Sequence, residues 1–185
     1  MKKIAIFASG SGSNAENIAN YFEGNEYLNI ECIYSNNAGA YVLERAKKFN
    51  IPTLVFSRDE FYNTEKVLDN LMLYDVDLVV LAGFLWLVPE YLIKNFTIIN
   101  IHPALLPAYG GKGMYGRKVH EAVVQNKERE TGITIHYVNE KYDEGQVIFQ
   151  AKCEVLPTDT PNDVAEKVHA LEYEHFPKVI EKLLL

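Results

Sequence analysis

The stretch Phe96-Thr97-Ile98-Ile99-Asn100-Ile101-His102-Pro103 combines a short apolar run with a carboxamide and an imidazole at its end. Because side chains alternate along a strand, Asn100 and His102 share one face, and the isoleucines next to them point to the other. Pro103 then ends the strand, since proline has no N–H to donate to a neighbouring strand. The stretch therefore predicts a buried strand that delivers two polar groups to a loop, where α/β enzymes hold their chemistry. Taken alone, it is equally compatible with a turn amide and a packing histidine.

The first hundred residues alternate apolar runs with amphipathic stretches, which is the pattern of a mainly parallel sheet covered by helices. The run 77–83 is apolar almost without alternation, so we expect it to form a central strand that is buried on both faces. Strands are expected at 4–8, 28–34, 53–56, 78–82 and 97–101, and helices at 15–22, 41–49, 60–73 and 89–94.

The pattern changes in the second half of the chain. A glycine-rich loop at 109–116 precedes a short helix at 117–125. Two strand-like runs follow at 132–138 and 146–153, joined by a short acidic connection. Strands joined in this way predict an antiparallel addition to the sheet.

The tail from 161 to 185 predicts one long closing helix. Thr160 and Asp163 supply capping groups near its start. Its apolar spacing assigns the inward face to Val164, Val168, Leu171, His175, Val179 and Leu183.

These patterns together predict an α/β fold with three layers. A mainly parallel twisted sheet with a Rossmann-like N-terminal half carries the antiparallel C-terminal addition and the closing C-terminal helix. No repeat, low-complexity tract or linker interrupts the chain, so we expect a single domain over 1–185. Within it, phosphate or nucleotide binding is expected in 1–100 and catalysis in 101–185.

Composition excludes several classes of protein. The chain has 185 residues, of which 48% are hydrophobic, enough to bury a sizeable core. Its formal charge of −7 disfavours binding to a nucleic acid backbone, which needs clustered Lys and Arg. No run approaches the roughly 18 to 20 apolar residues of a membrane span. Cys32 and Cys153 lie far apart without C-x-x-C spacing, so we expect buried thiols in a reducing, cytoplasmic location rather than a disulfide or metal site.

A glycine loop follows the first predicted strand. Ser9-Gly10-Ser11-Gly12-Ser13-Asn14-Ala15 is a G-x-G-x-x-A sequence before a helix, where backbone N–H groups can hold a phosphate. Dinucleotide sites usually place an acid at the end of the second strand, but here that strand ends Tyr34-Ser35-Asn36-Asn37. The loop therefore favours a single phosphate over a pyrophosphate, and a tight turn without a ligand stays open as an alternative.

A carboxylate lies between the two late strands, in Lys141-Tyr142-Asp143-Glu144-Gly145. We expect Asp143 at the bend of a hairpin, with Gly145 supplying a free φ; alone, this segment is only a turn. If Asp143 meets His102 and Asn100, the trio suits acyl transfer to an amine. Gly10-Ser11-Gly12 is not a G-x-S-x-G sequence, so a covalent acyl-enzyme is disfavoured and the nucleophile should belong to the substrate.

The chain resembles the formyltransferases that use 10-formyltetrahydrofolate, nearly from end to end. Within that family it is most similar to the enzymes that formylate glycinamide ribonucleotide in purine synthesis. The resemblance lies in Gly10-Ser11-Gly12-Ser13-Asn14, in Leu81-Ala82-Gly83-Phe84, in Asn100-Ile101-His102-Pro103 with Leu105-Leu106-Pro107, and in Gly132-Ile133-Thr134-Ile135-His136-Tyr137-Val138 continuing to Asp143-Glu144-Gly145.

The resemblance implies that Asn100, His102 and Asp143 are catalytic. They would transfer a formyl group from 10-formyltetrahydrofolate, the co-substrate, to the amine of glycinamide ribonucleotide on the route to IMP. Protonated His102 and Asn100 would bind the oxyanion of a tetrahedral intermediate. Asp143 would keep His102 charged and help to remove the amine proton, and no metal is implied.

The resemblance also implies binding residues, with folate binding assigned to the catalytic half, 101–185. Gly12, Ser13 and Asn14 would bind the ribonucleotide phosphate, Arg58 would lie on the ribonucleotide side, and Glu172 would hold the glycinamide end. The folate would contact, mainly through backbone, Phe84, Leu85, Trp86, Leu87 and Val88, together with Tyr142 and Asp143. In this chain Leu85-Trp86-Leu87-Val88 stands where many members have Met and a basic residue.

Other functions stay open from the sequence. Methionyl-tRNA formyltransferase and 10-formyltetrahydrofolate hydrolase share the trio, but we expect additional domains in both, for which 185 residues leave no room. A sugar-nucleotide amine formyltransferase is harder to separate, and a non-catalytic nucleotide-binding module would also explain the glycine loop. We expect small-molecule partners only, with no nucleic acid or membrane, and a monomer or homodimer.

Overall fold

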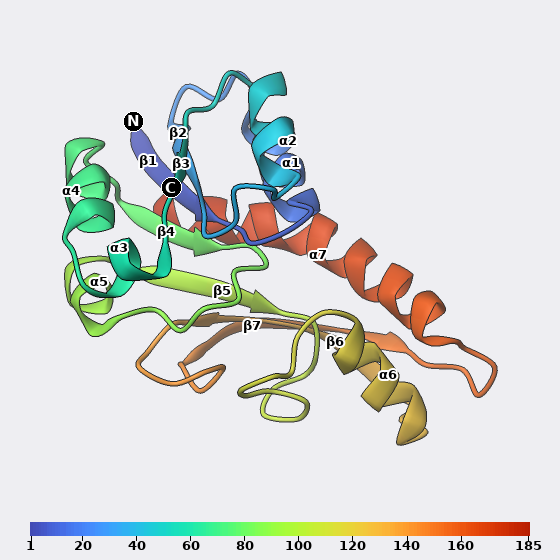
Figure 1. The fold of residues 1–185 in the computed structure, drawn as a ribbon. Coiled ribbons are helices and arrows are strands. Elements are labelled where there is room, and N and C mark those ends of the chain that lie inside the picture. Colours follow the sequence, from blue (N-terminus) through green and yellow to red (C-terminus); the bar gives the residue numbers. More distant parts are fainter. The chain divides into compact units, whose positions relative to one another are not determined.

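Seven strands form the sheet of the computed structural model, in the order β3-β2-β1-β4-β5-β6-β7, and the structure describes all residues from Met1 to Leu185 (Figure 1). The chain divides into two units, residues 1–99 with 184–185, and residues 100–183. The mainly parallel sheet with an antiparallel C-terminal addition confirms the predicted α/β fold class.

The first unit is built on parallel strands. β1 (Lys2–Phe7) pairs with β2 (Leu28–Ser35) on one side and β4 (Leu78–Leu81) on the other, and β2 pairs with β3 (Thr53–Val55). All four residues of β4 are buried, and β4 is the fourth of seven strands, as its uniformly apolar sequence predicts.

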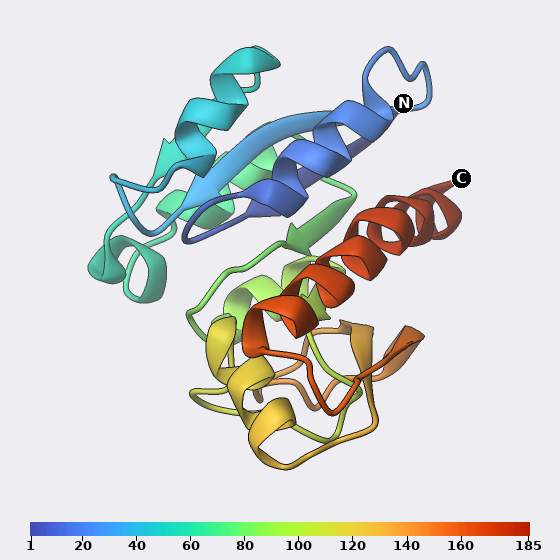
Figure 2. The same ribbon diagram turned by 90° about the vertical axis from the view of Figure 1, so that its right-hand side faces the viewer.

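Helices cover both faces of these strands. α1 (Ser13–Phe22) and α2 (Val42–Lys48) lie side by side on one face (Figures 1 and 2). The other face carries α3 (Arg58–Tyr62), α4 (Lys66–Leu73) and α5 (Glu90–Asn95).

The second unit contains the end of β5 (Ile98–His102), then α6 (Arg117–Gln125), β6 (Glu130–Tyr137), β7 (Val147–Glu154) and most of α7 (Pro161–Leu184). β6 and β7 pair antiparallel, as predicted, with Ile133 opposite Ala151. Thr160 and Asp163 cap α7 reciprocally: each backbone N–H donates to the other residue's side chain, at 2.7 and 3.2 Å.

The single helix expected over 60–73 is wrong, because the segment forms two helices, α3 and α4. A capping box between Ser57 and Glu60 starts α3. The Thr64 hydroxyl then donates to the Glu60 carbonyl over 2.8 Å, and its oxygen accepts from the Lys66 N–H at 3.3 Å. A short polar side chain that bonds the backbone competes with the helix, which explains the break.

The inward face of α7 also differs from the prediction. Leu171, His175 and Leu183 are only partly buried, and the fully covered stripe runs with four-residue spacing instead. That stripe consists of Val164, Val168, Glu172, Phe176 and Ile180. A carboxylate therefore occupies a core position of this helix.

The two cysteines are free thiols in different environments. Cys32 is buried in β2, as expected, and burial raises the pKa of its thiol to about 12. Cys153 is only half-buried, which corrects the expectation, because it lies on β7 at the edge of the sheet. None of the helices combines the length and the apolar character that crossing a membrane requires.

Candidate active site

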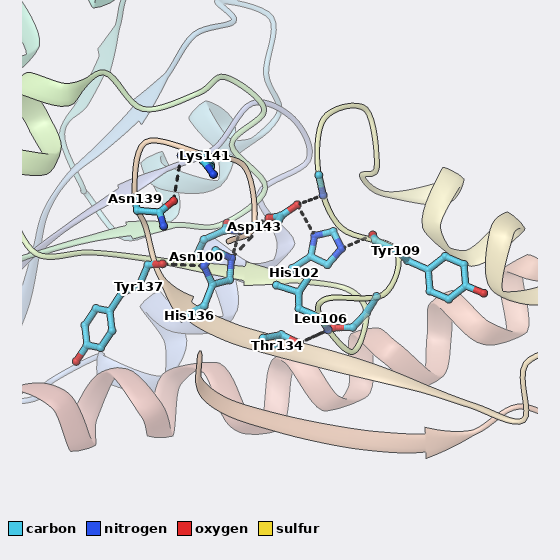
Figure 3. A network of polar contacts seen from close by, with 12 residues as sticks. Asn100, His102, Leu106, Tyr109, Thr134, His136, Tyr137, Asn139, Lys141 and Asp143 are labelled. Carbon is cyan, nitrogen blue, oxygen red and sulfur yellow. Dashed lines mark hydrogen bonds and ion pairs between the residues drawn. The ribbon is translucent and has the colours of Figure 1, made fainter. Parts of the chain in front are cut away.

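The end of β5 presents a polar pair inside an apolar strand. His102 is 3% exposed and Asn100 is partly buried, while Ile99 and Ile101 are core residues. Figure 3 shows that the side chains of Asn100 and His102 converge with those of Asp143 and of a second histidine, His136. The expected meeting of the strand end with the Asp143 turn is therefore present in the structure.

His102 is held through both ring nitrogens. Nε2 lies 2.7 Å from the carbonyl oxygen of Tyr109, to which it donates, and Nδ1 lies 3.5 Å from Asp143 Oδ2. Burial lowers the pKa of His102, and the charge of Asp143 opposes that shift only in part. That Asp143 keeps this ring charged during catalysis stays a prediction.

Asp143 is held as a carboxylate. Burial by itself would raise its pKa, but the neighbouring side chains of His136 and His102 and the Gly111 N–H together lower it. The Gly111 N–H donates to Asp143 Oδ2 over 2.9 Å, and Asn100 Nδ2 lies 3.5 Å from Oδ1. The site thus combines an ionised acid with a histidine that can accept a proton.

The backbone conformation of the turn that carries Asp143 differs from the prediction. The residue with left-handed backbone is Asp143 itself, at φ 57°, and Gly145 does not have a positive φ. Gly145 is required for a steric reason: a Cβ there would lie 1.6 Å from the Tyr137 carbonyl oxygen. Close approach to β6, not a free φ, therefore explains this glycine.

His136 is a member of the network that we did not assign from the sequence. Its Nδ1 lies 2.8 Å from the Tyr137 carbonyl oxygen, so Nδ1 carries the proton. Nε2 is then an acceptor, and it receives a hydrogen bond from Asn100 Nδ2 at 3.2 Å. This tautomer fixes the direction of the Asn100 amide, because the flipped carboxamide would point an oxygen at an unprotonated nitrogen.

A second polar side chain of β6 anchors the loop that follows β5. The Thr134 hydroxyl donates to the Ala104 carbonyl over 2.7 Å. It also accepts from the Leu106 N–H at 3.0 Å (Figure 3). Thr134 and His136 alternate with the buried Ile133 and Ile135. A polar residue at every second position of an otherwise apolar strand was the sequence signal for both side chains.

Glu172 lies in the same unit as the trio. It is 4% exposed on α7, and His169 Nδ1 donates to its Oε2 over 2.9 Å. The charge of Glu172 acts on His102 in the direction that raises the pKa of the histidine. The carboxylate is therefore near enough to influence the catalytic candidates.

The glycine loop lies in the first unit and is tied to α2. Gly12 has φ 71° and precedes α1, and a Cβ on it would lie 2.3 Å from Val42 Cγ2. The Gly10 carbonyl accepts from the Val42 N–H at 3.1 Å, and the Ser11 carbonyl accepts from Arg45 Nε at 2.8 Å. The loop is thus a fixed turn at a helix N-terminus, where N–H groups lack intrahelical partners.

The segment proposed for folate also lies in the first unit. Phe84 and Val88 are 8% and 5% exposed, so their side chains are core groups and only Leu85, at 44%, is well exposed. The Leu85 N–H donates to Ser9 Oγ over 3.1 Å, and the Leu87 carbonyl accepts from the Tyr62 hydroxyl at 2.8 Å. These contacts hold the backbone of the segment in place. Tyr142 is partly buried and precedes Asp143 in the second unit.

Arg58 and Trp86 contact each other. The Arg58 guanidinium carbon lies 5.0 Å from the centre of the Tyr62 ring and 5.6 Å from that of Trp86. Trp86 also packs against Phe61, with ring centres 5.8 Å apart. Arg58 is exposed, and it lines a surface hollow together with Asp59, Tyr62 and Asn63.

The trio has the chemistry for acyl transfer to an amine. Asn100 offers an amide donor, His102 a buried imidazole and Asp143 an ionised acid, whereas neither cysteine belongs to the network. No group of three or more His, Cys, Asp or Glu side chains is arranged to hold a metal ion.

Comparisons with known proteins agree with this architecture. The chain is 40% identical over 187 residues to the chloroplastic phosphoribosylglycinamide formyltransferase of Arabidopsis thaliana, covering 97% of this chain and 64% of that protein. It is 36% identical over 191 residues to the phosphoribosylglycinamide formyltransferase of Bacillus subtilis, covering 100% of this chain and 95% of the relative. The crystal structure of glycinamide ribonucleotide transformylase 1 from Geobacillus kaustophilus matches with a TM-score of 0.89 at 33% identity, over 100% of both chains.

The length of the match differs among relatives. The chain spans 64% and 61% of the plant proteins from Arabidopsis thaliana and Vigna unguiculata. Residues 2–180 match the family model described as formyl transferase. The chain therefore belongs to the formyl transferase family.

Proposed function

We propose that this protein transfers a formyl group from 10-formyltetrahydrofolate to the amine of glycinamide ribonucleotide, a step of purine biosynthesis. The observation that carries the proposal is the convergence of Asn100, His102 and Asp143, with His102 Nδ1 3.5 Å from Asp143 Oδ2. The names of the relatives and of the matched structure support the choice of substrates.

Asn100 and His102 stabilise the oxyanion in this proposal. The amine of the ribonucleotide attacks the formyl carbon, a carbon–nitrogen bond forms, and negative charge develops on the formyl oxygen. Asn100 Nδ2 donates one of its hydrogens to His136. Its second hydrogen faces Asp143 Oδ1, and the distance of 3.5 Å makes that bond weak enough for an oxyanion to replace it. An anion beside His102 favours the protonated ring, so the imidazole takes up a proton from solvent as the oxyanion forms and releases it when the oxyanion collapses.

Asp143 takes the proton that the attacking amine must lose, directly or through a water. Its lowered pKa keeps it ionised at neutral pH. The Gly111 N–H and the side chain of His136 on β6 orient it. Collapse then breaks the bond between the formyl carbon and the folate nitrogen, which receives the proton held by Asp143 and leaves as tetrahydrofolate.

The remaining residues bind the two substrates. Gly12, Ser13 and Asn14 hold the ribonucleotide phosphate at the N-terminus of α1, and Glu172 holds the glycinamide end. Arg58 lies on the ribonucleotide side. The folate contacts the backbone of 84–88 and the connection at Tyr142. We expect the protein to act in the cytoplasm as a monomer or homodimer.

One assay tests the proposal. The protein is incubated with glycinamide ribonucleotide and a 10-formyl folate, and the folate absorbance is followed with and without the ribonucleotide. We expect turnover only with both substrates, and formylated ribonucleotide as product by mass spectrometry. Folate turnover without the ribonucleotide would identify a hydrolase. No folate turnover in either mixture would contradict the proposal.

A further inference from the structure

A carboxylate interrupts the buried stripe of α7. Val168 and Phe176 are each 0% exposed, and Glu172, between them, is 4% exposed. Residues four apart lie on one face of a helix, so the carboxylate occupies a position on the inward face, where an apolar side chain is normally found. A buried charge is costly unless it is paired, so its partners decide what it can do.

His169, one turn earlier on α7, reaches this carboxylate from the surface. The side chain of His169 is 46% exposed and that of Glu172 5%, and Nδ1 donates to Oε2 over 2.9 Å. The hydrogen bond to Glu172 raises the pKa of His169, and burial opposes the shift. The pair thus joins a buried acid to a base that solvent can protonate.

The neighbouring helix presents a second histidine to this pair. Figure 2 shows α6 beside the first half of α7, and the ring centres of His120 and His169 lie 6.3 Å apart. Burial lowers the pKa of His120, and the charge of His169 lowers it further. Besides His120, the groups that face His169 are Glu172 and the stacked ring of Tyr173. Glu172 is therefore the charged group with which His169 pairs.

We infer that His169 is a positioning residue for the ribonucleotide: by holding the buried Glu172 carboxylate in one direction, it sets how tightly that carboxylate binds substrate. The inference rests on the function proposed above, in which Glu172 contacts the glycinamide end. A charge-assisted hydrogen bond is about twice as strong as a neutral one, so the hold is firmest when His169 is protonated.

The test compares three variants by their steady-state kinetics at about pH 6 and about pH 8.5, on either side of an ordinary histidine pKa. His169→Leu removes the donor, and we expect KM for the ribonucleotide to rise about tenfold at the lower pH, with kcat within about twofold. His169→Gln keeps an N–H donor, so its KM should stay within about threefold of the native value. His175→Gln on the same helix, where His175 packs against Phe149, is the matched control.

The outcomes separate the inference from the function on which it rests. A KM unchanged in His169→Leu at both pH values, in a protein that transfers formyl groups, would overturn the positioning role alone. Absence of formyl transfer in the native protein would overturn the proposed function. The pair itself is tested by NMR titration, because Glu172→Gln should lower the pKa of His169, and an unchanged pKa would contradict the contact.

Discussion

At the scale of single residues, the tautomer of His136 decides what the trio can do. Because His136 Nδ1 donates to the backbone, the neutral ring accepts at Nε2, and Asn100 offers its amide nitrogen to it. The amide therefore faces the site as a donor, as stabilisation of an oxyanion requires. Asp143 contributes the one group that stays ionised near neutral pH, since its pKa is lowered.

Asp143→Asn should lower kcat by about 10² or more while KM changes little, because the amide cannot accept the amine proton and general base catalysis is typically worth 10²–10⁴. The measurement is steady-state formyl transfer with both substrates varied. Asp69→Asn, at an exposed position on α4, is the control and should leave kcat unchanged. A native kcat in Asp143→Asn would remove this residue from the mechanism.

His136→Leu should lower kcat by about tenfold, because the Asn100 amide loses the acceptor that directs it. The free energy of unfolding should also fall, by about 1–3 kcal/mol, since the Tyr137 carbonyl loses a buried donor. Kinetics and urea unfolding are measured on the same preparation. Loss of stability with a native kcat would show that His136 only supports the fold.

At the scale of elements, close packing sets where glycine and polar residues are needed. Gly12 lies against Val42, and Gly145 lies against the backbone of Tyr137, so neither position accepts a Cβ without movement. On α7 the carboxylate of Glu172 lies in the buried stripe and is bonded by His169, which reaches it from the surface. Both glycines are thus required by close approach to a neighbouring part of the chain.

Gly12→Ala should raise KM for the ribonucleotide more than it changes kcat. The added Cβ would meet Val42 at 2.3 Å, and the residue is left-handed at φ 71°, so the loop must move away from the form that we propose to bind phosphate. Gly39→Ala, where the nearest atom is 3.5 Å away, is the control. An unchanged KM would indicate that the loop is a turn without a ligand.

At the scale of the whole molecule, buried histidines link stability to pH. Burial lowers the pKa values of His102 and His120 below the ordinary 6.5, so their stabilising contribution is present above that pH and is lost as the pH falls below it. His169 has a raised pKa, so its contribution is present below pH 6.5 and is lost as the pH rises through its own pKa.

Below pH 6.5 the contribution of His169 is fully present, whereas those of His102 and His120 are lost. The free energy of unfolding should therefore fall as the pH decreases from about 6.5 to about 5.5. The slope is at most about 1.4 kcal/mol per pH unit for a net difference of one proton. Urea unfolding at several pH values measures it, and His120→Leu should flatten the dependence. Stability that rises toward acid would contradict the directions assigned to these groups.

The sequence by itself determined the class of fold and the order of its elements. Strand and helix periods are local properties, and the uniformly apolar β4, the antiparallel pair and the closing helix could all be read from them. The identity of Asn100, His102 and Asp143 as candidates also came from the sequence, since their positions at strand ends and turns are local.

Only the tertiary structure decided how those groups meet. The tautomer of His136, the lowered pKa of His102, the steric need for Gly145 and the inward position of Glu172 all depend on atoms distant along the chain. Burial and hydrogen bonding act across space, whereas sequence patterns report the neighbours along the backbone. The chemistry of the site therefore depends on the end of β5, β6 and α7 coming together in one unit.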